Sequence, residues 1–454
     1  MNIFRTKIAS HSTEKSDLAR CLSAFDLTLL GIGAIIGAGI FVLTGIAAAT
    51  KAGPAVMLSY TISGFACLFA ALSYAELAAS IKGTGSAYSY AYAGLGEIVA
   101  WVMGWTLILE YGVGACAIGI GWSGYVNDML LSFGITIPTQ FLKPYAEGGL
   151  VNLPAAGIIL LLSGVLALGA KESARLNAVI VFIKLSVIAI FIATASMEVK
   201  FSNWQPFMPF GWKGVMQGAA LVFFAFIGFD AVSTAAEEAK NPQKDLALAT
   251  IGSLLICTIV YVVVSGLLTG IVSYTTLNTE SPVADAILSL GHKTAGEIIS
   301  IGAVAGLTSG VLIFMFGLSR ILYAMATDGL LPSMLAKVNA FTKTPTRLIL
   351  FSGLFLAIIA GFCPMEEVAE IVNIGTLAAF VIVCFSVILL RRTKPHLPRP
   401  FKTPFYPMIP LLGIISCGYL MFNLPWITWQ RFLIWVFIGI LLYFLYGYRH
   451  SRLA

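Results

Sequence analysis

The chain has 454 residues, of which 59% are hydrophobic and only 11% are charged, and its mean hydropathy is +0.92. A water-soluble domain of this size would not carry so much apolar sequence, so the composition indicates a polytopic membrane protein. The net charge of +6 does not indicate nucleic-acid binding, because the basic residues lie in short loops between apolar stretches.

Twelve apolar stretches predict an all-α protein with twelve transmembrane helices. They cover residues 25–50, 54–80, 97–125, 152–170, 176–199, 214–239, 246–271, 294–327, 347–363, 367–390, 405–424 and 429–448. The polar segment before them, residues 1–24, has no short apolar core followed by a cleavage site, so we expect no removable signal peptide.

The first stretch contains four glycines in the nine residues 31–39. Glycine costs about 1 kcal/mol relative to alanine inside a helix, so this density predicts a helix that is broken at Gly37, Ala38 and Gly39. Unpaired backbone at membrane depth is tolerated where it lines a cavity, and the free N–H groups that begin a half-helix favour a carboxylate. Close packing of two helices is the alternative, since it also uses small residues.

A second interruption is predicted in the sixth stretch, where Gly228 and the carboxylate of Asp230 break an apolar run. Equivalent elements that lie five spans apart must face opposite ways across the membrane. Broken helices at matching places in inverted halves are typical of a transport site near the midplane. The two halves would be residues 25–199 and 214–392, and residues 405–448 would be an addition of two helices.

The basic residues predict the orientation. If the N-terminus is cytoplasmic, the inner segments hold 19 of the 27 Lys and Arg residues, the outer segments hold 6, and the other 2 lie within spans. The positive-inside rule therefore places the tails, residues 1–24 and 449–454, in the cytoplasm.

Four stretches carry a family resemblance: Gly31–Phe41, Leu109–Gly112, Ile227–Asp230 followed by Glu237-Glu238 and Asn241-Pro242, and Ser319–Pro332. With them the chain resembles the amino acid–polyamine–organocation superfamily, in the branch of bacterial permeases similar to cationic amino acid transporters. The resemblance covers most of the chain. It implies amino acid transport and the 5+5 inverted-repeat fold of the bacterial leucine transporter, with discontinuous helices 1 and 6. Members carry Gly-Thr-Gly or Gly-Ala-Gly at the first break, and Ala38 means that this chain lacks the hydroxyl there.

An amino acid zwitterion needs partners for both of its charges in a dry site. We expect the backbone N–H groups of Gly37, Ala38 and Gly39 to bind its carboxylate. The ammonium group would meet carbonyls freed at the two breaks, those of Ile35, Phe224, Ala225 and Ile227. Phe224 also resembles the family's aromatic lid, or gate, over the substrate, and an aromatic ring packed between helices is the alternative.

Lys184 lies in the fifth span, about eight residues or roughly 12 Å from its inner end. Inserting lysine at such a depth costs about 2.5–3.5 kcal/mol, and desolvation favours its neutral form, which makes proton release feasible. In proton-coupled relatives a lysine ammonium stands where others bind sodium. The resemblance implies contacts with the carbonyls of Gly33 and Ile36 and the hydroxyls of Thr308 and Ser309. We interpret Lys184 as the proton-coupling residue, and a static charge that fixes span 5 against span 1 is the alternative.

Two carboxylates also lie at membrane depth. Glu110 is predicted to act on the substrate side or on a proton, and Asp230 to have a structural and gating role, because a carboxylate stabilises the N-terminus of a half-helix. Near the inner helix ends, ion pairs of a cytoplasmic gate or solvated faces are expected for Glu76, Glu237, Glu238 and Arg320.

The sequence therefore predicts a secondary active transporter of the cell membrane that imports amino acids with protons by alternating access. Bulky residues on span 8, Phe314, Met315 and Phe316, favour small neutral substrates over cationic ones. An amino acid exchanger, an Arg/Lys transporter and a nutrient sensor on a transporter fold are the alternatives. The seven cysteines and four histidines show no metal spacing and no catalytic cluster, so we expect no enzyme, no cofactor and no metal. The expected partners are the amino acid, protons and the lipid bilayer.

Overall fold

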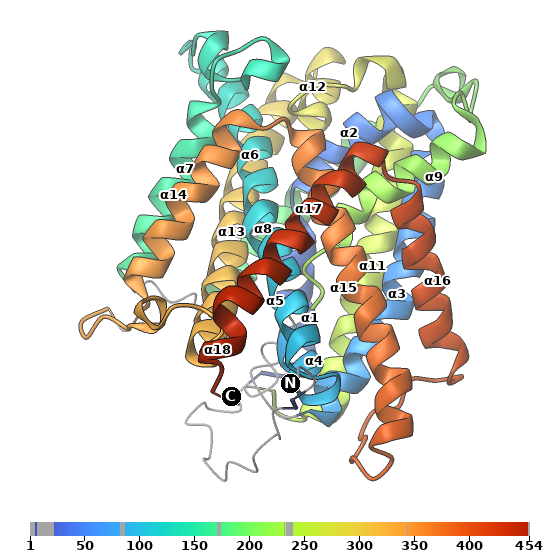
Figure 1. Cartoon of the computed structure of the whole chain (residues 1–454). Coiled ribbons are helices and arrows are strands. Elements are labelled where there is room, and N and C mark those ends of the chain that lie inside the picture. The colour runs from blue at the N-terminus through green and yellow to red at the C-terminus, as the bar shows by residue number, and fades with distance from the viewer. Residues whose placement is uncertain are drawn as a thin grey trace.

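A computed structural model describes residues 5–6, 22–81, 87–169, 174–230, 232, 239–342 and 344–452. All regular structure in this part of the chain is helical, and Figure 1 shows a single bundle with both termini at the same end. Within these described residues, six helices are long and apolar enough to cross a membrane: Gly39–Ser80, Glu97–Ser132, Lys244–Ile271, Lys293–Thr327, Met365–Thr393 and Trp426–His450. The shorter apolar helices are Ala24–Ile35, Leu153–Ala167, Val179–Ala195, Thr346–Phe362 and Met408–Phe422.

The described residues of the first half contain an interrupted helix and three π-helical turns. The main helices of this half are α1 (Ala24–Ile35), α2 (Thr44–Ala47), α3 (Val56–Ser80), α4 (Ala87–Gly94), α5 (Glu97–Leu107), α6 (Gly114–Ser132), α7 (Leu153–Ala167) and α8 (Ala174–Ala195). Two π-helical turns, η1 (Gly39–Leu43) and η4 (Ile108–Val113), lie between α1 and α2 and between α5 and α6, and the third, η2 (Ala48–Ala52), follows α2. Such turns are rare and are frequent at functional sites.

In the second half a 3₁₀ turn, η8 (Phe223–Phe226), follows α9 (Gly211–Val222). The remaining helices are α11 (Pro242–Ile271), α12 (Pro282–Ser289), α13 (Lys293–Thr327), α14 (Thr346–Phe362), α15 (Met365–Thr393), α16 (Met408–Phe422), α17 (Trp426–Leu442) and α18 (Tyr448–His450). Helices α1, α3 and α8 pack against α11, whereas α6 packs against α13 and α7 against α14.

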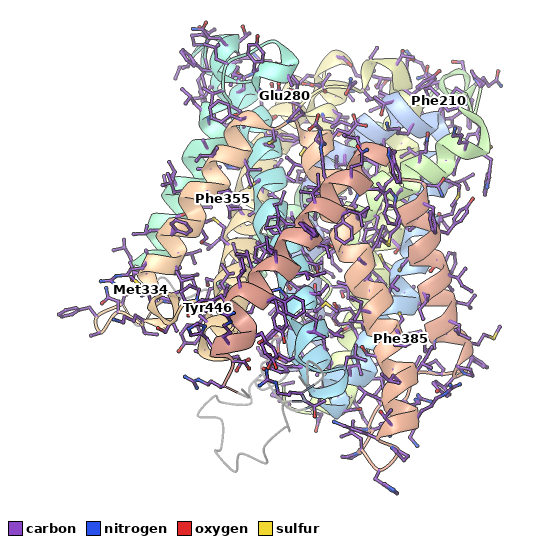
Figure 2. The ribbon with its side chains drawn as sticks, viewed as in Figure 1. Phe210, Glu280, Met334, Phe355, Phe385 and Tyr446 are labelled. Carbon is purple, nitrogen blue, oxygen red and sulfur yellow. The ribbon has the colours of Figure 1, made fainter. Side chains whose placement is uncertain are left out.

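The outer surface of the bundle is apolar. Phe355 on α14 and Phe385 on α15 are about half exposed, at 52% and 50%, and Figure 2 shows both on the flank of the bundle. A soluble protein would bury side chains of this size, so these faces fit a lipid environment.

Two buried carboxylates tie the helices together at the end that holds the termini. Glu97, at the start of α5, accepts hydrogen bonds from the hydroxyls of Tyr92 (3.0 Å), Tyr443 (2.8 Å) and Ser451 (2.5 Å). Glu76, at the end of α3, accepts two bonds from Arg391, of 2.8 and 2.6 Å. The contacts with Tyr443, Ser451 and Arg391 join segments that lie more than 300 residues apart.

The sequence predicts ion pairs or solvated faces for four charged residues near the inner helix ends, and the structure describes two of them. Glu76 is in an ion pair with Arg391 and also accepts the N–H of Thr403 at 2.7 Å. The guanidinium of Arg320 lies 4.1 Å from the centre of the Phe316 ring. Glu237 and Glu238 lie outside the described residues.

Helix α17 is anchored on α5 by tryptophans. The indole N–H of Trp105 donates to the carbonyl of Trp435 at 2.8 Å, and that of Trp435 donates to the carbonyl of Trp105 at 3.1 Å. Their rings stack with centres 4.5 Å apart. Because each buried indole N–H has a partner, this contact is both apolar and fully hydrogen-bonded.

Candidate functional site

The first helix breaks within the glycine-rich stretch. Helix α1 ends at Ile35, Ile36 is extended (φ −73°, ψ 106°), and the first hydrogen bond of the next segment runs from the N–H of Phe41 to the carbonyl of Gly37. Among the described residues, nothing accepts a hydrogen bond from the N–H groups of Gly37, Ala38 and Gly39. Three backbone donors are thus free at the start of a helix, which is where an anion binds.

The second break lies at the end of η8. Ile227 is extended (φ −63°, ψ 136°) and Gly228 has φ +111°. A Cβ on Gly228 would lie 2.9 Å from the carbonyl oxygen of Ala34, so both the backbone conformation and the contact with α1 require glycine.

The two breaks touch each other through Gly39. A Cβ there would lie 2.3 Å from the Cα of Ala225, so Gly39 serves the close helix packing that was the alternative interpretation. Gly37 differs, because a Cβ on it would meet nothing within 4 Å although the residue is buried. A small open space therefore lies beside the free N–H groups.

The carbonyls of Ile35 and Ala225 converge on one hydroxyl. Tyr261 of α11 lies 2.9 Å from each carbonyl oxygen. A hydroxyl has one proton to share between the two acceptors, so both carbonyls retain capacity for an ammonium group. The carbonyl of Phe224 also accepts one hydrogen bond, from the N–H of Ile227 at 3.2 Å. Sequence reasoning missed Tyr261, whose only signal is a tyrosine inside an apolar span.

Two more tyrosines hold the π-helical turn η1. The hydroxyl of Tyr60 on α3 donates to the carbonyl of Gly39 at 2.9 Å, and that of Tyr125 on α6 donates to the carbonyl of Phe41 at 2.7 Å. Thr44 also donates to the carbonyl of Ile40 at 2.8 Å. The wide turn therefore presents its carbonyls to neighbouring helices, and the half-helix is fixed from two sides.

Lys184 is 1% exposed and reaches the end of α1. Its Nζ donates to the carbonyl oxygens of Gly33 and Ile36, both at 2.8 Å. The aliphatic part of the side chain lies against Gly306 of α13, where a Cβ would come within 2.9 Å of Lys184 Cγ. One buried ammonium group thus connects α8 to the last turn of α1 and to the break, and charge-assisted bonds of this kind are strong.

The hydroxyls of Thr308 and Ser309, which the resemblance places at this lysine, form hydrogen bonds with other groups. Thr308 accepts the indole N–H of Trp122 at 2.8 Å and donates to the carbonyl of Val304 at 2.7 Å. Ser309 donates to the carbonyl of Gly306 at 2.9 Å.

Glu110 in η4 and Asp230, which follows the second break, are two buried carboxyl groups near this break. Glu110 is 1% exposed and Asp230 is 6% exposed, and the two carboxyl groups interact electrostatically. The hydroxyl of Tyr111 donates to Asp230 at 2.7 Å. Neither oxygen of Glu110 has a hydrogen-bond partner among the described residues.

The bulky residues of span 8 do not all face inward. Phe314 is 3% exposed and packs against Tyr111, with ring centres 5.7 Å apart, and Met315 is also 3% exposed. Phe316 is 37% exposed, so the expectation that it narrows the interior is wrong. Phe224, the expected lid, is 4% exposed.

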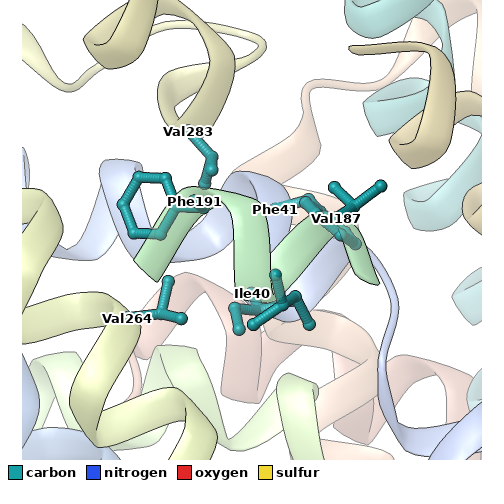
Figure 3. A pocket seen from close by; sticks show the side chains of 7 residues that line it. Ile40, Phe41, Val187, Phe191, Val264 and Val283 are labelled. Atoms are coloured by element: carbon teal, nitrogen blue, oxygen red, sulfur yellow. The ribbon is translucent and has the colours of Figure 1, made fainter. Parts of the chain in front are cut away.

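An apolar pocket lies next to the first break. It is lined by Ile40, Phe41, Val187, Ile188, Phe191, Val264 and Val283, and Figure 3 shows these aliphatic and aromatic side chains facing it. This lining offers no partner for a charged group, so the charges of a zwitterion fit the breaks and not this pocket.

Comparison with known proteins assigns this arrangement to a large group of transporters. A family described as "Amino acid permease" matches residues 22–445. The branched-chain amino acid permease BcaP of Bacillus subtilis is 50% identical, over 100% of this chain and 99% of the relative. The methylthioribose transporter of Bacillus subtilis is 46% identical over the same shares. The human cationic amino acid transporter 4 is 32% identical over 99% of this chain and 90% of its own length.

Proposed function

Because this chain belongs to the amino acid permease family, within the amino acid–polyamine–organocation superfamily, we propose that it imports neutral amino acids together with protons by alternating access. Its relatives are permeases and other transporters, so the protein is a transporter and not an enzyme. The apolar helices and the family make it an integral membrane protein.

The proton step rests on Lys184. Its ammonium group bonds to the carbonyl of Gly33 in the last turn of α1 and to that of Ile36 at the break. Loss of the proton would remove the charge from both bonds and loosen α1 from α8. Transfer of this proton to the inside would then accompany the movement of α1 that opens the site.

The fold that we propose for this mechanism has twelve spans. Residues 25–199 and 214–392 would form the inverted repeats, with residues 405–448 added, and both tails would be cytoplasmic. Three observations support it: each proposed repeat has its first helix interrupted, at Ile36 and at Ile227, both termini lie at one end (Figure 1), and the basic residues favour that side.

The zwitterion would lie between the two breaks. Its carboxylate would bind the N–H groups of Gly37, Ala38 and Gly39, and its ammonium group would bind the carbonyls of Ile35 and Ala225. These contacts bind only the carboxylate and ammonium groups that all amino acids share, so the residues that line the rest of the site must select the side chain. We propose that these residues admit small to branched neutral side chains, and that cationic ones come second. The relative that transports branched-chain amino acids supports this order.

A second candidate substrate is a thioether sugar, because a relative of 46% identity is a methylthioribose transporter. Such a molecule has no carboxylate and no ammonium group. It would therefore leave the backbone groups at the breaks without charged partners, and competition experiments separate the two substrates.

Uptake into proteoliposomes tests the proposal. Radiolabelled alanine, leucine and arginine are supplied outside, with an inward proton gradient, with and without sodium, and with unlabelled methylthioribose as competitor. Accumulation of alanine or leucine that needs the proton gradient and ignores sodium supports symport. Uptake only into vesicles preloaded with amino acid would identify an exchanger, and a substrate that binds without crossing would identify a sensor.

The carboxylate site has a test of its own. Gly37→Ala places a methyl group in the open space beside the free N–H groups, so we expect KM for alanine to rise about tenfold or more, a loss of about 1.4 kcal/mol of binding, with little change in melting temperature. Gly157→Ala is the matched control, because a Cβ there also meets nothing within 4 Å but lies on the exposed side of α7. An unchanged KM for Gly37→Ala would move the carboxylate elsewhere.

A further inference from the structure

We propose that Glu110 and Asp230 hold one proton between them and so form a second proton-binding site, separate from Lys184. Protonation of the pair is inferred from the burial of Glu110, the hydrogen bond of Asp230 and the electrostatic interaction of the two groups, whereas its part in transport rests on the symport proposed above. The two carboxyl groups come from different halves of the chain, Glu110 from the π-helical turn η4 and Asp230 from the residues after η8.

The Glu110 carboxyl group lacks the partners that a buried carboxylate needs. Both of its oxygens are buried, and the only hydrogen-bond donor that the described residues offer them is the hydroxyl of Thr376, whose contact does not meet the geometry of a normal hydrogen bond. No described lysine or arginine forms an ion pair with it. Burying an isolated ionised carboxylate costs far more than burying the neutral acid, so a proton on this group is the stable arrangement.

Asp230 is the carboxyl group that interacts electrostatically with Glu110, and its environment differs. The hydroxyl of Tyr111 donates to its Oδ2 at 2.7 Å, which favours the ionised form. A protonated Glu110 and an ionised Asp230 then carry one negative charge where two would repel each other in a site of low dielectric. Two carboxyl groups that share one proton behave as a unit when they titrate.

Polar side chains surround this pair. Besides Asp230 and Tyr111, the titratable group that faces Glu110 is Tyr74 of α3. Thr376 of α15 lies beside the Glu110 carboxyl group. The hydroxyl of Tyr74 is buried and has no hydrogen-bond partner among the described residues. Such an atom costs about 1–3 kcal/mol unless something binds it, so ordered water is expected to link it to the carboxyl groups.

A proton fits this set of groups better than a metal ion does. The described residues contain no group of three or more His, Cys, Asp or Glu side chains that could hold a metal. Tyr111 also uses its hydroxyl as a donor toward Asp230, whereas a cation would require oxygens that point their lone pairs at it.

The proton on the pair would control the contact between the two halves. Helix α15 packs against both η4 and η8, so Glu110 and Asp230 lie in a tightly packed region. Loss of the shared proton would leave two negative charges there and push the segment after the second break away from η4. Protonation from one side of the membrane and release on the other would therefore favour movement of that segment.

Infrared difference spectroscopy of the full chain in lipid vesicles tests the inference without transport. Wild type at neutral pH should show a carbonyl stretch of a buried protonated carboxylic acid. We expect Glu110→Gln to remove this band, Asp230→Asn to shift it, and Lys184→Met to leave it. Glu366→Gln is the control and should not change it, because Glu366 forms an exposed ion pair with Lys51 at 2.9 Å.

Three results would overturn the inference: no acid band in wild type, a band that persists in Glu110→Gln, or a band that sodium abolishes at constant pH. If Glu110→Gln does not fold, Glu110→Asp and Asp230→Asn must each shift the band, and an unshifted band in both would also overturn it. If the acid band is present but uptake does not depend on the proton gradient, symport is refuted and the shared proton on Glu110 and Asp230 is not. The two proposals can therefore be refuted separately.

Discussion

Replacing Lys184 by methionine removes the buried charge and keeps most of the side-chain volume beside Gly306. The lysine makes two charge-assisted hydrogen bonds of 2.8 Å to the carbonyls of Gly33 and Ile36. Bonds of this type contribute about 1.5–3 kcal/mol each, so the change weakens the attachment of α1 to α8 by roughly 3–6 kcal/mol. That is enough to change the equilibrium constant between two positions of α1 by a factor of a hundred or more.

The assay is uptake of alanine into proteoliposomes with the membrane potential held at zero. For one proton per substrate, an inward gradient of one pH unit supplies about 1.36 kcal/mol, so wild type should concentrate alanine about tenfold. Lys184→Met should reach only equal concentrations inside and outside, while it still exchanges labelled for unlabelled alanine.

The control is Lys293→Met, which removes an exposed lysine at the start of α13 and should concentrate alanine like wild type. Tenfold accumulation by Lys184→Met would refute proton coupling through this residue. Loss of both accumulation and exchange, together with a lower melting temperature, would instead identify Lys184 as the static structural charge.

Three further outcomes follow from contacts that the structure shows. Tyr261→Phe removes the hydroxyl shared by two backbone carbonyls, so thermal unfolding should show a loss of about 1 kcal/mol and the KM for alanine should change. Glu76→Gln leaves the guanidinium of Arg391 without its buried partner, so the melting temperature should fall by the equivalent of about 3 kcal/mol; an unchanged value would mean that the pair contributes nothing. Desolvation raises the pKa of Glu280 and Asp285 in the loop around α12, and Figure 2 shows Glu280 at the end of the bundle opposite the termini. Acidic groups with raised pKa values stabilise the folded segment at low pH. The protection of residues 277–289 against hydrogen exchange, relative to the unfolded chain at the same pH, should therefore fall as the pH rises through those values.

The positions of the two breaks could be predicted because they depend on backbone chemistry that the sequence carries locally. The glycines around residue 37 and the Gly228-Phe229-Asp230 run are poor helix formers in otherwise apolar stretches, and α1 and η8 end beside them. The contacts of Lys184 with α1 could be anticipated only from the resemblance, since no periodicity joins residues 151 positions apart.

The partners of the tyrosines could not be predicted. Helices that are apolar on all sides give no signal of which face turns inward, so nothing distinguishes Tyr60 or Tyr261 from an interfacial tyrosine until the helices are packed. The same ambiguity explains the error at Phe316, which follows two buried residues on α13 but faces outward. Glu76 was placed near an inner helix end, but its partner Arg391 is 315 residues away.

The contact between Glu97 and Ser451 has a consequence for biosynthesis. Ser451 leaves the ribosome 354 residues after Glu97, and Tyr443, another donor to this carboxylate, leaves only slightly earlier. Until then Glu97 lacks two of its hydrogen-bond donors, and a membrane insertion machine must hold an unfinished helix bundle. Nascent chains that stop before residue 443 should therefore be recognised as incomplete and degraded, although every glycine and lysine of the transport site has already been made.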